Sequence, residues 1–134
     1  MHFERRFTSA GTDPYQALEF RSAASEIRNP DGTVVFRAEH VEVPTQFSQV
    51  ATDILAQKYF RKAGVPAALT RIEESAVPSW LWRSVPDEKA LAKLPEEDRF
   101  VGETSAKQVF NRLAGTWTYW GWKGGRLWKS IFQG

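Results

Sequence analysis

The chain has 134 residues, a formal net charge of +2, 42% hydrophobic and 25% charged residues, and no cysteine. This length fits one domain, and the composition is close to the average for globular proteins, which excludes disorder throughout the chain. The absence of cysteine excludes a disulfide framework, a thiolate nucleophile and a sulfur-ligated metal, and the small net charge gives no strong attraction to nucleic acid or anionic membranes.

The first third of the sequence predicts a small antiparallel strand system. Residues 3–8 and 18–28 have the pattern of extended chain. The turn sequence Asn-Pro-Asp-Gly follows at 29–32, with Pro and Asp at the central positions and Gly supplying a permissive backbone. Residues 33–37 are the partner strand, so we expect a β-hairpin.

A helix is predicted over residues 46–63. Pro44 closes the strand region, Thr45 is the expected N-cap, and Gly64 and Pro66 end the helix. Its apolar stripe is Phe47, Val50, Ala51, Ile54 and Leu55.

The next part of the sequence is punctuated by prolines. Residues 65–85 predict an irregular connection, anchored by burial of the cluster Trp80-Leu81-Trp82. Pro86 is expected to start a short helix to residue 94, and Pro95 to stop it. Residues 95–98, with three consecutive acids, predict a solvated turn.

The most informative part of the chain is residues 103–125, ETSAKQVFNRLAGTWTYWGWKGG. A helix is predicted over 104–114, with Thr104 or Ser105 as N-cap and Gly115 as a left-handed C-cap. Its apolar face is Ala106, Val109, Phe110 and Leu113. The aromatic residues beyond it carry too much apolar area to be left in water, so we expect other structure to cover them.

Four stretches carry a family resemblance. They are FERRFT at 3–8, DILAQKYFRKAGVPAAL at 53–69, VPSWLWRSVPDE at 77–88 and the run at 103–125. In this order they resemble the N-terminal region of the class II, vitamin B12-dependent ribonucleotide reductases. The resemblance implies residues 1–125 as the N-terminal domain, while residues 126–134 are a divergent C-terminal tail. The implied fold class is α+β, with a small antiparallel β-hairpin or sheet followed by about three helices, preceding the ten-stranded α/β barrel of the reductase.

The resemblance also implies that the barrel, rather than this N-terminal region, carries the catalytic groups. The intact enzyme converts ribonucleotides to deoxyribonucleotides for DNA synthesis, with adenosylcobalamin as cofactor and cysteines of the barrel as radical carriers. This sequence is several times shorter than such an enzyme and has no cysteine. We therefore expect no catalytic, cofactor-binding or metal-binding residue in this chain. Its expected partner is the reductase barrel, in the same polypeptide or in trans, and ribonucleotides bind only to the full enzyme.

The aromatic run leaves two functions open. It is either a buried hinge that packs the 104–114 helix onto neighbouring structure, or a platform that stacks on nucleobases, with Lys123 and Arg126 contacting phosphate. In the second case the chain is a stand-alone nucleotide- or protein-binding module. The residues involved in packing or ligand contact are Trp117, Tyr119, Trp120, Trp122 and Lys123.

The remaining polar clusters predict no site. His2 and His40 are far apart and lack the spacing of metal ligands, so His40 is expected on the surface at a strand end. The acidic groups at 73–74 and 96–98 are expected to be solvated. The basic clusters, Arg5-Arg6 and Lys58 with Arg61-Lys62, are interrupted by acids and do not form the continuous stripe that nucleic-acid binding requires. No apolar run of about 18 residues and no signal-peptide core is present, so we expect a cytoplasmic protein without membrane contact.

Overall fold

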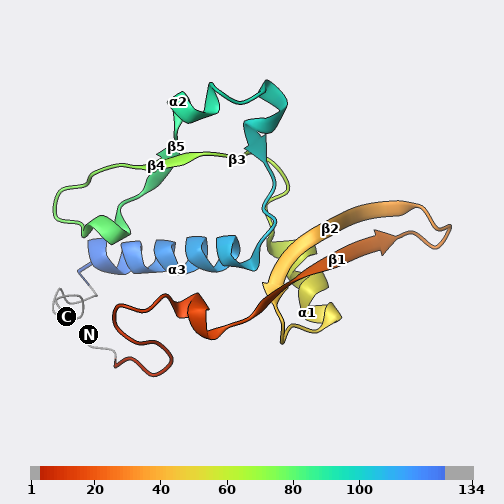
Figure 1. The fold of residues 1–134 in the computed structure, drawn as a ribbon, viewed down its shortest axis with the longest axis horizontal. Helices are drawn as coiled ribbons and strands as arrows, with labels where there is room; N and C mark the ends of the chain where they lie inside the picture. Colours follow the sequence, from red (N-terminus) through yellow and green to blue (C-terminus); the bar gives the residue numbers. More distant parts are fainter. Residues whose placement is uncertain (1–3, 126–134) are drawn as a thin grey trace.

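The computed structural model describes residues 4–125 (Figure 1). Its elements are, in order, η1 (Pro14–Ala17), β1 (Phe20–Arg28), β2 (Val34–Pro44), α1 (Gln49–Ile54), η2 (Leu55–Tyr59), β3 (Val65–Pro66), β4 (Leu69–Arg71), η3 (Ser79–Leu81), β5 (Ser84–Pro86), α2 (Glu88–Leu91), η4 (Glu96–Asp98), β6 (Phe100–Val101) and α3 (Ala106–Lys123). Antiparallel strand pairs and three α-helices confirm the predicted α+β class, and no closed barrel is formed by residues 4–125.

The predicted hairpin is confirmed, with a turn built as the sequence indicates. The N–H of Gly32 donates to the carbonyl of Asn29 at 2.9 Å, and the Asp31 carboxylate accepts from the N–H of Thr33 at 2.8 Å. Gly32 has a φ of +87°, which side-chain-bearing residues rarely adopt.

The second strand is longer than the predicted 33–37. β1 and β2 pair antiparallel until Phe20 lies opposite Pro44. This end of the hairpin buries Val41 and Val43, and that burial extends the strand beyond the point where its polar alternation becomes irregular. Figure 1 shows the other end, the turn, reaching away from the rest of the molecule.

The extended segment predicted at 3–8 is wrong for its described part, because residues 4–8 form no strand. Phe7 is almost fully exposed, so nothing in this segment anchors a strand. The chain is first fixed at η1, where Asp13 caps the turn by accepting from the N–H of Tyr15 at 2.9 Å.

The helix predicted over 46–63 begins later than expected. Its N-cap is Ser48 rather than Thr45, since the Ser48 hydroxyl accepts from the N–H of Ala51 at 3.1 Å. The N–H of Thr45 instead donates to the carbonyl of Glu19 at 2.9 Å, which holds that residue at the hairpin base.

The same helix also ends earlier. Its last turn is the π-helical η2, and Phe60 is already extended, with a ψ of 131°. Gly64, predicted to end the helix, instead forms the turn into β3 with a φ of +77°.

The predicted apolar stripe of this helix is partly wrong. Val50 and Ile54 are 67% and 46% exposed, while Thr52, Leu55 and Ala56 are buried. The face that meets the hairpin is therefore rotated around the helix axis from the predicted one.

A β-bulge in β1 fixes this orientation. The register shifts between Ala23 and Ser25, and the carbonyl of the intervening Ala24 accepts from the Gln49 side chain at 2.8 Å. Asp53 accepts from both the Ser25 hydroxyl at 2.7 Å and Gln49 at 2.8 Å, so α1 is hydrogen-bonded to the bulge.

Residues 65–101 form a segment of short elements rather than the single irregular connection predicted for 65–85. β3 pairs with β6 at its base, and β4 pairs with β5. The helix predicted over 86–94 is only α2, capped by Asp87, because Pro86 belongs to β5. The predicted turn at 95–98 contains η4, and its acids are exposed as expected.

The helix predicted over 104–114 starts correctly and ends incorrectly. Ser105 caps α3, and Gln108 completes a capping box. Gly115 is not a C-cap, because α3 continues through it to Lys123 and stops at Gly124 and Gly125, the latter with a φ of +66°. Side-chain contacts beyond Gly115, described below, outweigh its low helix propensity.

The main core lies where the base of the hairpin, α1 with η2, and the first half of α3 meet. Its buried residues are Ala23, Val41, Val43, Leu55, Ala56, Phe60, Ala106 and Val109. Figure 1 shows α3 between the hairpin side of the molecule and the 65–101 segment. Among residues 4–125, no helix is long and apolar enough to cross a lipid bilayer.

Candidate functional site

The second half of α3 carries the aromatic residues singled out in the sequence, and it packs against residues 71–83, the segment between β4 and β5 that includes η3 and that we call the 71–83 turn. The hydroxyl of Tyr119 donates to the Glu74 carboxylate at 2.9 Å, and Arg83 contacts the same carboxylate at 3.0 Å. The guanidinium carbon of Arg83 also lies 5.9 Å from the centre of the Tyr119 ring. These three side chains join α3 to both arms of the turn.

The expectation that residues 73–74 are solvated is wrong for Glu74. Its side chain is only 12% exposed, and its Oε2 atom is buried and accepts no hydrogen bond from the described residues. Burial by itself raises the pKa of Glu74, but the Tyr119 hydrogen bond and the Arg83 charge outweigh it, so the pKa lies below its ordinary value. The carboxylate is therefore held in its charged form.

Two further predicted residues make contacts here: Trp122 contacts the turn, and Lys123 contacts the ring of Tyr119. The indole N–H of Trp122 donates to the carbonyl of Ala76 at 2.8 Å. Ala76 itself has a φ of +62°, a strained backbone for alanine that this hydrogen bond helps to hold. The ammonium of Lys123 lies 5.6 Å from the centre of the Tyr119 ring.

The other two indoles point elsewhere. Trp117 and Trp120 are 63% and 64% exposed. Helical spacing places them on the face of α3 that carries Ala106, Val109 and Leu113, rather than on the face that meets the 71–83 turn. The sequence grouped all five residues together. The structure separates Tyr119 and Trp122, which bind the turn, and Lys123, which lies by the Tyr119 ring, from the exposed pair Trp117 and Trp120.

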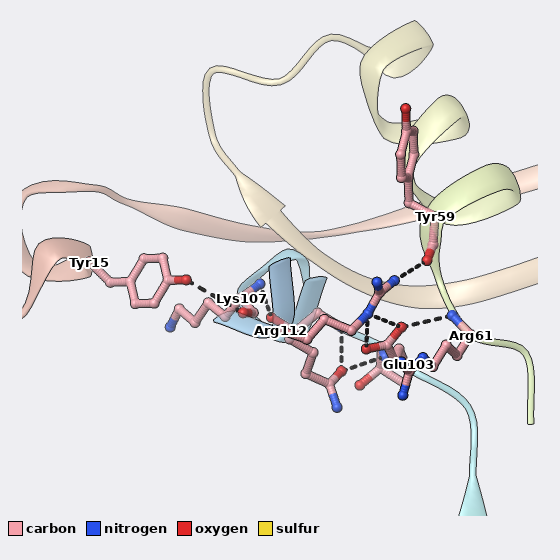
Figure 2. A network of polar contacts seen from close by, with 9 residues as sticks. Tyr15, Tyr59, Arg61, Glu103, Lys107 and Arg112 are labelled. Carbon is pink, nitrogen blue, oxygen red and sulfur yellow. Dashed lines mark hydrogen bonds and ion pairs between the residues drawn. The ribbon is translucent and has the colours of Figure 1, made fainter. Parts of the chain in front are cut away.

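A second polar network, which the sequence did not indicate, fixes the first half of α3 (Figure 2). The side chain of Glu103 is 4% exposed. Its oxygens accept from the N–H of Arg61 at 2.8 Å and from the Arg112 guanidinium at 3.1 and 3.2 Å. Arg112 also donates to the carbonyl of Tyr59. Glu103 and Arg112 thus bind the backbone groups left free where η2 ends.

The backbone beside Glu103 is closely packed. A Cβ atom at Gly102 would lie 2.8 Å from the carbonyl oxygen of Lys62, so a side chain at this position would displace the main chain. The N–H of Glu103 donates to the carbonyl of Arg61 at 2.8 Å. We define the Glu103 clamp as Glu103, Arg112 and the backbone of residues 59–62.

The remaining predicted clusters do not meet in one place. His40 is exposed within β2 rather than at a strand end, and residues 4–125 contain no group of three metal-ligating side chains. Lys62 lies 4.1 Å from the centre of the Phe36 ring, and burial lowers the pKa of its ammonium. Arg5 donates to its neighbour Thr8 at 3.3 Å. His2, Arg126 and the tail 126–134 lie outside the described residues.

This arrangement does not fit the binding of a cobalamin cofactor. His40, the one histidine among the described residues, is exposed on the hairpin, and the sequence supplies no thiol for radical chemistry. The buried polar groups are engaged in joining elements: Glu103 serves the end of η2, and Glu74 serves the 71–83 turn. We assign no step of cofactor chemistry to these residues.

Comparison with known proteins places these features in a family. Residues 21–130 match the family model described as class II vitamin B12-dependent ribonucleotide reductase. The chain is 66% identical to the vitamin B12-dependent ribonucleotide reductase of Bradyrhizobium diazoefficiens over 125 aligned residues, and this alignment covers 93% of the chain. It is 67% identical over 124 residues, 92% of its length, to the protein of the same name from Agrobacterium fabrum. The chain spans about a tenth of the length of these relatives, matching their N-terminal region.

Proposed function

The chain belongs to the class II vitamin B12-dependent ribonucleotide reductase family, and from this premise we propose that it is a structural, non-catalytic N-terminal part of such an enzyme. The complete enzyme would convert ribonucleotides to deoxyribonucleotides for DNA synthesis in the cytoplasm, with adenosylcobalamin supplying the radical. Residues 1–125 would form the N-terminal domain, with 126–134 as a separate tail. The partner would be the catalytic reductase domain, in the same polypeptide or in trans.

One observation carries this proposal: a chain without cysteine aligns along 93% of its length with a tenth of a reductase. A reductase needs a thiol to carry the radical and usually a dithiol to supply electrons. Those groups must then come from the remaining nine tenths of the enzyme. The chain's own role is to present a rigid surface to that part.

The Glu103 clamp supports a structural role. Hydrogen bonds between charged groups in a buried site are stronger and more directional than those between neutral groups. The clamp therefore fixes the first half of α3 relative to the end of η2. The Glu74 contacts then fix the far half of the same helix to the 71–83 turn. The two networks hold an 18-residue helix at both ends, as a scaffold requires.

A chimera tests the proposal in a complete enzyme. Residues 1–125 replace the matching region of the Bradyrhizobium diazoefficiens reductase, and deoxyribonucleotide formation is measured with adenosylcobalamin and a dithiol. We expect the chimera to be active and the isolated chain to form no product under the same conditions. Product from the isolated chain, or an inactive chimera that folds and binds cobalamin normally, would contradict the proposal.

The exposed indoles favour one alternative, a stand-alone module that stacks on nucleobases. Single-stranded nucleic acids and nucleotides bind aromatic platforms of this kind when basic groups lie alongside. Titration of the isolated chain with ribonucleotides, followed by tryptophan fluorescence, separates the two functions. We expect no saturable change. A saturable change that Trp120→Ala abolishes and Trp82→Ala preserves would favour the module.

A further inference from the structure

The apolar face of α3 continues past the core that covers it. Ala106 and Val109 are buried, and Leu113 packs against the core. Trp117 and Trp120 follow at the same helical spacing, and they are 63% and 64% exposed. One stripe of side chains is therefore covered along the first half of the helix and uncovered along the second.

The uncovered half has the composition of an interface. Helical geometry places small residues beside the two indoles, namely Ala114, Thr116, Gly121 and Gly124. Between residues 113 and 125 the only charged residue is Lys123. It follows Trp120 by three positions, at the edge of this face, and its ammonium lies 5.6 Å from the centre of the Tyr119 ring. A surface with two aromatic anchors, small neighbours and a single charge at its edge matches the centre of a protein interface.

The area of this face indicates a tethered occupant. Two indoles with this exposure offer about 300 Å² in total, whereas a stable interface between free proteins buries about 800 Å² on each partner. A surface in the same polypeptide does not lose translational freedom on docking, so a smaller contact suffices. The relatives carry about nine times this length of additional chain.

We propose that the face of α3 formed by Trp117 and Trp120 is the docking surface for an uncharged, apolar surface of the reductase polypeptide outside this chain. This inference rests on the proposed function and assigns the contact to one face of one helix. The two indoles extend the apolar face of α3 beyond the core of this chain, and they pack against apolar side chains of the catalytic part. The 71–83 turn, bound to the opposite side through Tyr119 and Trp122, keeps the helix from rotating.

The first test locates the occupant by photo-crosslinking in the complete chimera. Trp120 is replaced by p-benzoylphenylalanine, and crosslinked peptides are identified by mass spectrometry. Val35, 61% exposed on the hairpin, is the control position. We expect Trp120 crosslinks to peptides outside the replaced region and within the same polypeptide. Crosslinks to this chain's own residues, to a second copy, or none above the Val35 control would each overturn the inference.

The second test measures stability in two contexts. Trp117→Ala together with Trp120→Ala should lower the unfolding midpoint of the chimera, yet shift that of the isolated chain by less than about 2 °C, because exposed side chains contribute little. Equal loss in both contexts would place the cover within this chain and overturn the inference. An active chimera whose unfolding midpoint does not change with the double substitution would overturn the inference and leave the proposed function intact. A chimera that is inactive without any substitution would instead count against the proposed function.

Discussion

Glu103 is the residue on which the position of α3 most depends. It is a buried carboxylate with both oxygens engaged, one of them by a backbone N–H from a segment 42 residues earlier. Glu103→Ala removes the carboxylate from the half-buried Arg112 guanidinium, which keeps only the carbonyl of Tyr59, and leaves the N–H of Arg61 without this acceptor. We expect a loss of about 2–4 kcal/mol in the free energy of unfolding of the isolated chain, measured by urea denaturation.

Glu97→Ala is the matched control, because this glutamate is exposed in η4. We expect it to change stability by no more than about 0.5 kcal/mol. A loss at Glu103 as small as that at Glu97 would mean that the clamp does not hold the helix. Arg112→Ala in a double-mutant cycle should show coupling with Glu103, since the two side chains are in direct contact.

Glu74 gives the molecule a pH dependence with a definite sign. Its pKa in the folded chain lies below the ordinary value of 4.5, so the folded state binds the proton less readily than the unfolded state does. The stabilisation is fully present above pH 4.5 and is lost as pH falls through the lower folded pKa. Wild type should therefore exceed Glu74→Gln in urea midpoint at neutral pH, and the gap should close on acidification.

Tyr119→Phe is the companion variant to this measurement. It removes the hydroxyl that donates to Glu74 and leaves the ring in place. The pKa of Glu74 should rise toward its ordinary value, and the acid-dependent part of the stability should shrink. A pKa of Glu74 that is unchanged by Tyr119→Phe, followed by carboxyl NMR titration, would contradict this account.

At the residue scale, the sequence reveals local hydrogen bonds and misses distant ones. Ser105 is one of the two predicted N-caps of α3, and Gln108, three positions later, completes a capping box with it. Glu103 and Arg112 are nine residues apart, and their other partners are backbone groups of residues 59–61, for which no spacing rule exists. Glu74 was expected in solvent because the acids around it suggested a polar turn, and only the folded chain places Tyr119 above it.

At the scale of the element, α3 shows why a glycine alone does not end a helix. Gly115 has an ordinary helical backbone, and a Cβ atom there would meet nothing within 4 Å. Tyr119 and Trp122 extend the helix because their polar atoms reach Glu74 and Ala76 only if the helix continues. The sequence predicted the start of this element from its cap, but its end depends on contacts with residues some 45 positions earlier.

Substituting this glycine tests the corrected boundary. Gly115→Ala should stabilise the isolated chain by about 0.5–1 kcal/mol, because alanine is the better residue in a helix interior. Gly125→Ala should destabilise it by about 1 kcal/mol, since Gly125 has a φ of +66°. Thermal unfolding followed by circular dichroism measures both. Destabilisation by Gly115→Ala would indicate a left-handed cap at residue 115.

The helix that begins with α1 shows that the start of a helix, like its end, depends on tertiary contacts. Thr45 and Ser48 are both acceptable N-caps by residue type, and the choice between them is made by the strand pairing that binds the N–H of Thr45. The apolar stripe was misplaced for the same reason, because the hydrogen bonds of Asp53 to the bulge set which face meets the hairpin. Periodicity predicts that a helix exists, and tertiary contacts decide its start and its rotation.

At the scale of the whole molecule, the chain divides into two parts of unequal burial. The core at the hairpin base contains eight buried apolar residues from the hairpin, the helix α1 with η2, and α3. The 65–101 segment buries only Val77, Leu81 and Leu91, and its strands are two or three residues long. This difference follows from its sequence, in which prolines at 66, 78, 86 and 95 prevent long regular elements.

Unequal burial predicts unequal local stability, which amide hydrogen exchange measures. Segments with few buried apolar contacts open at lower free energy than the global unfolding transition. We expect the amides of β1, β2 and the first half of α3 to exchange slowest, and those of β4, β5 and α2 to exchange at least about tenfold faster, equal to about 1.4 kcal/mol in opening free energy. In the active chimera, the second half of α3 should gain protection if its exposed face is covered there, whereas β4 and β5 should change less. Equal protection throughout the isolated chain would show instead that the Glu103 clamp and the Glu74 contacts couple both parts into one cooperative unit.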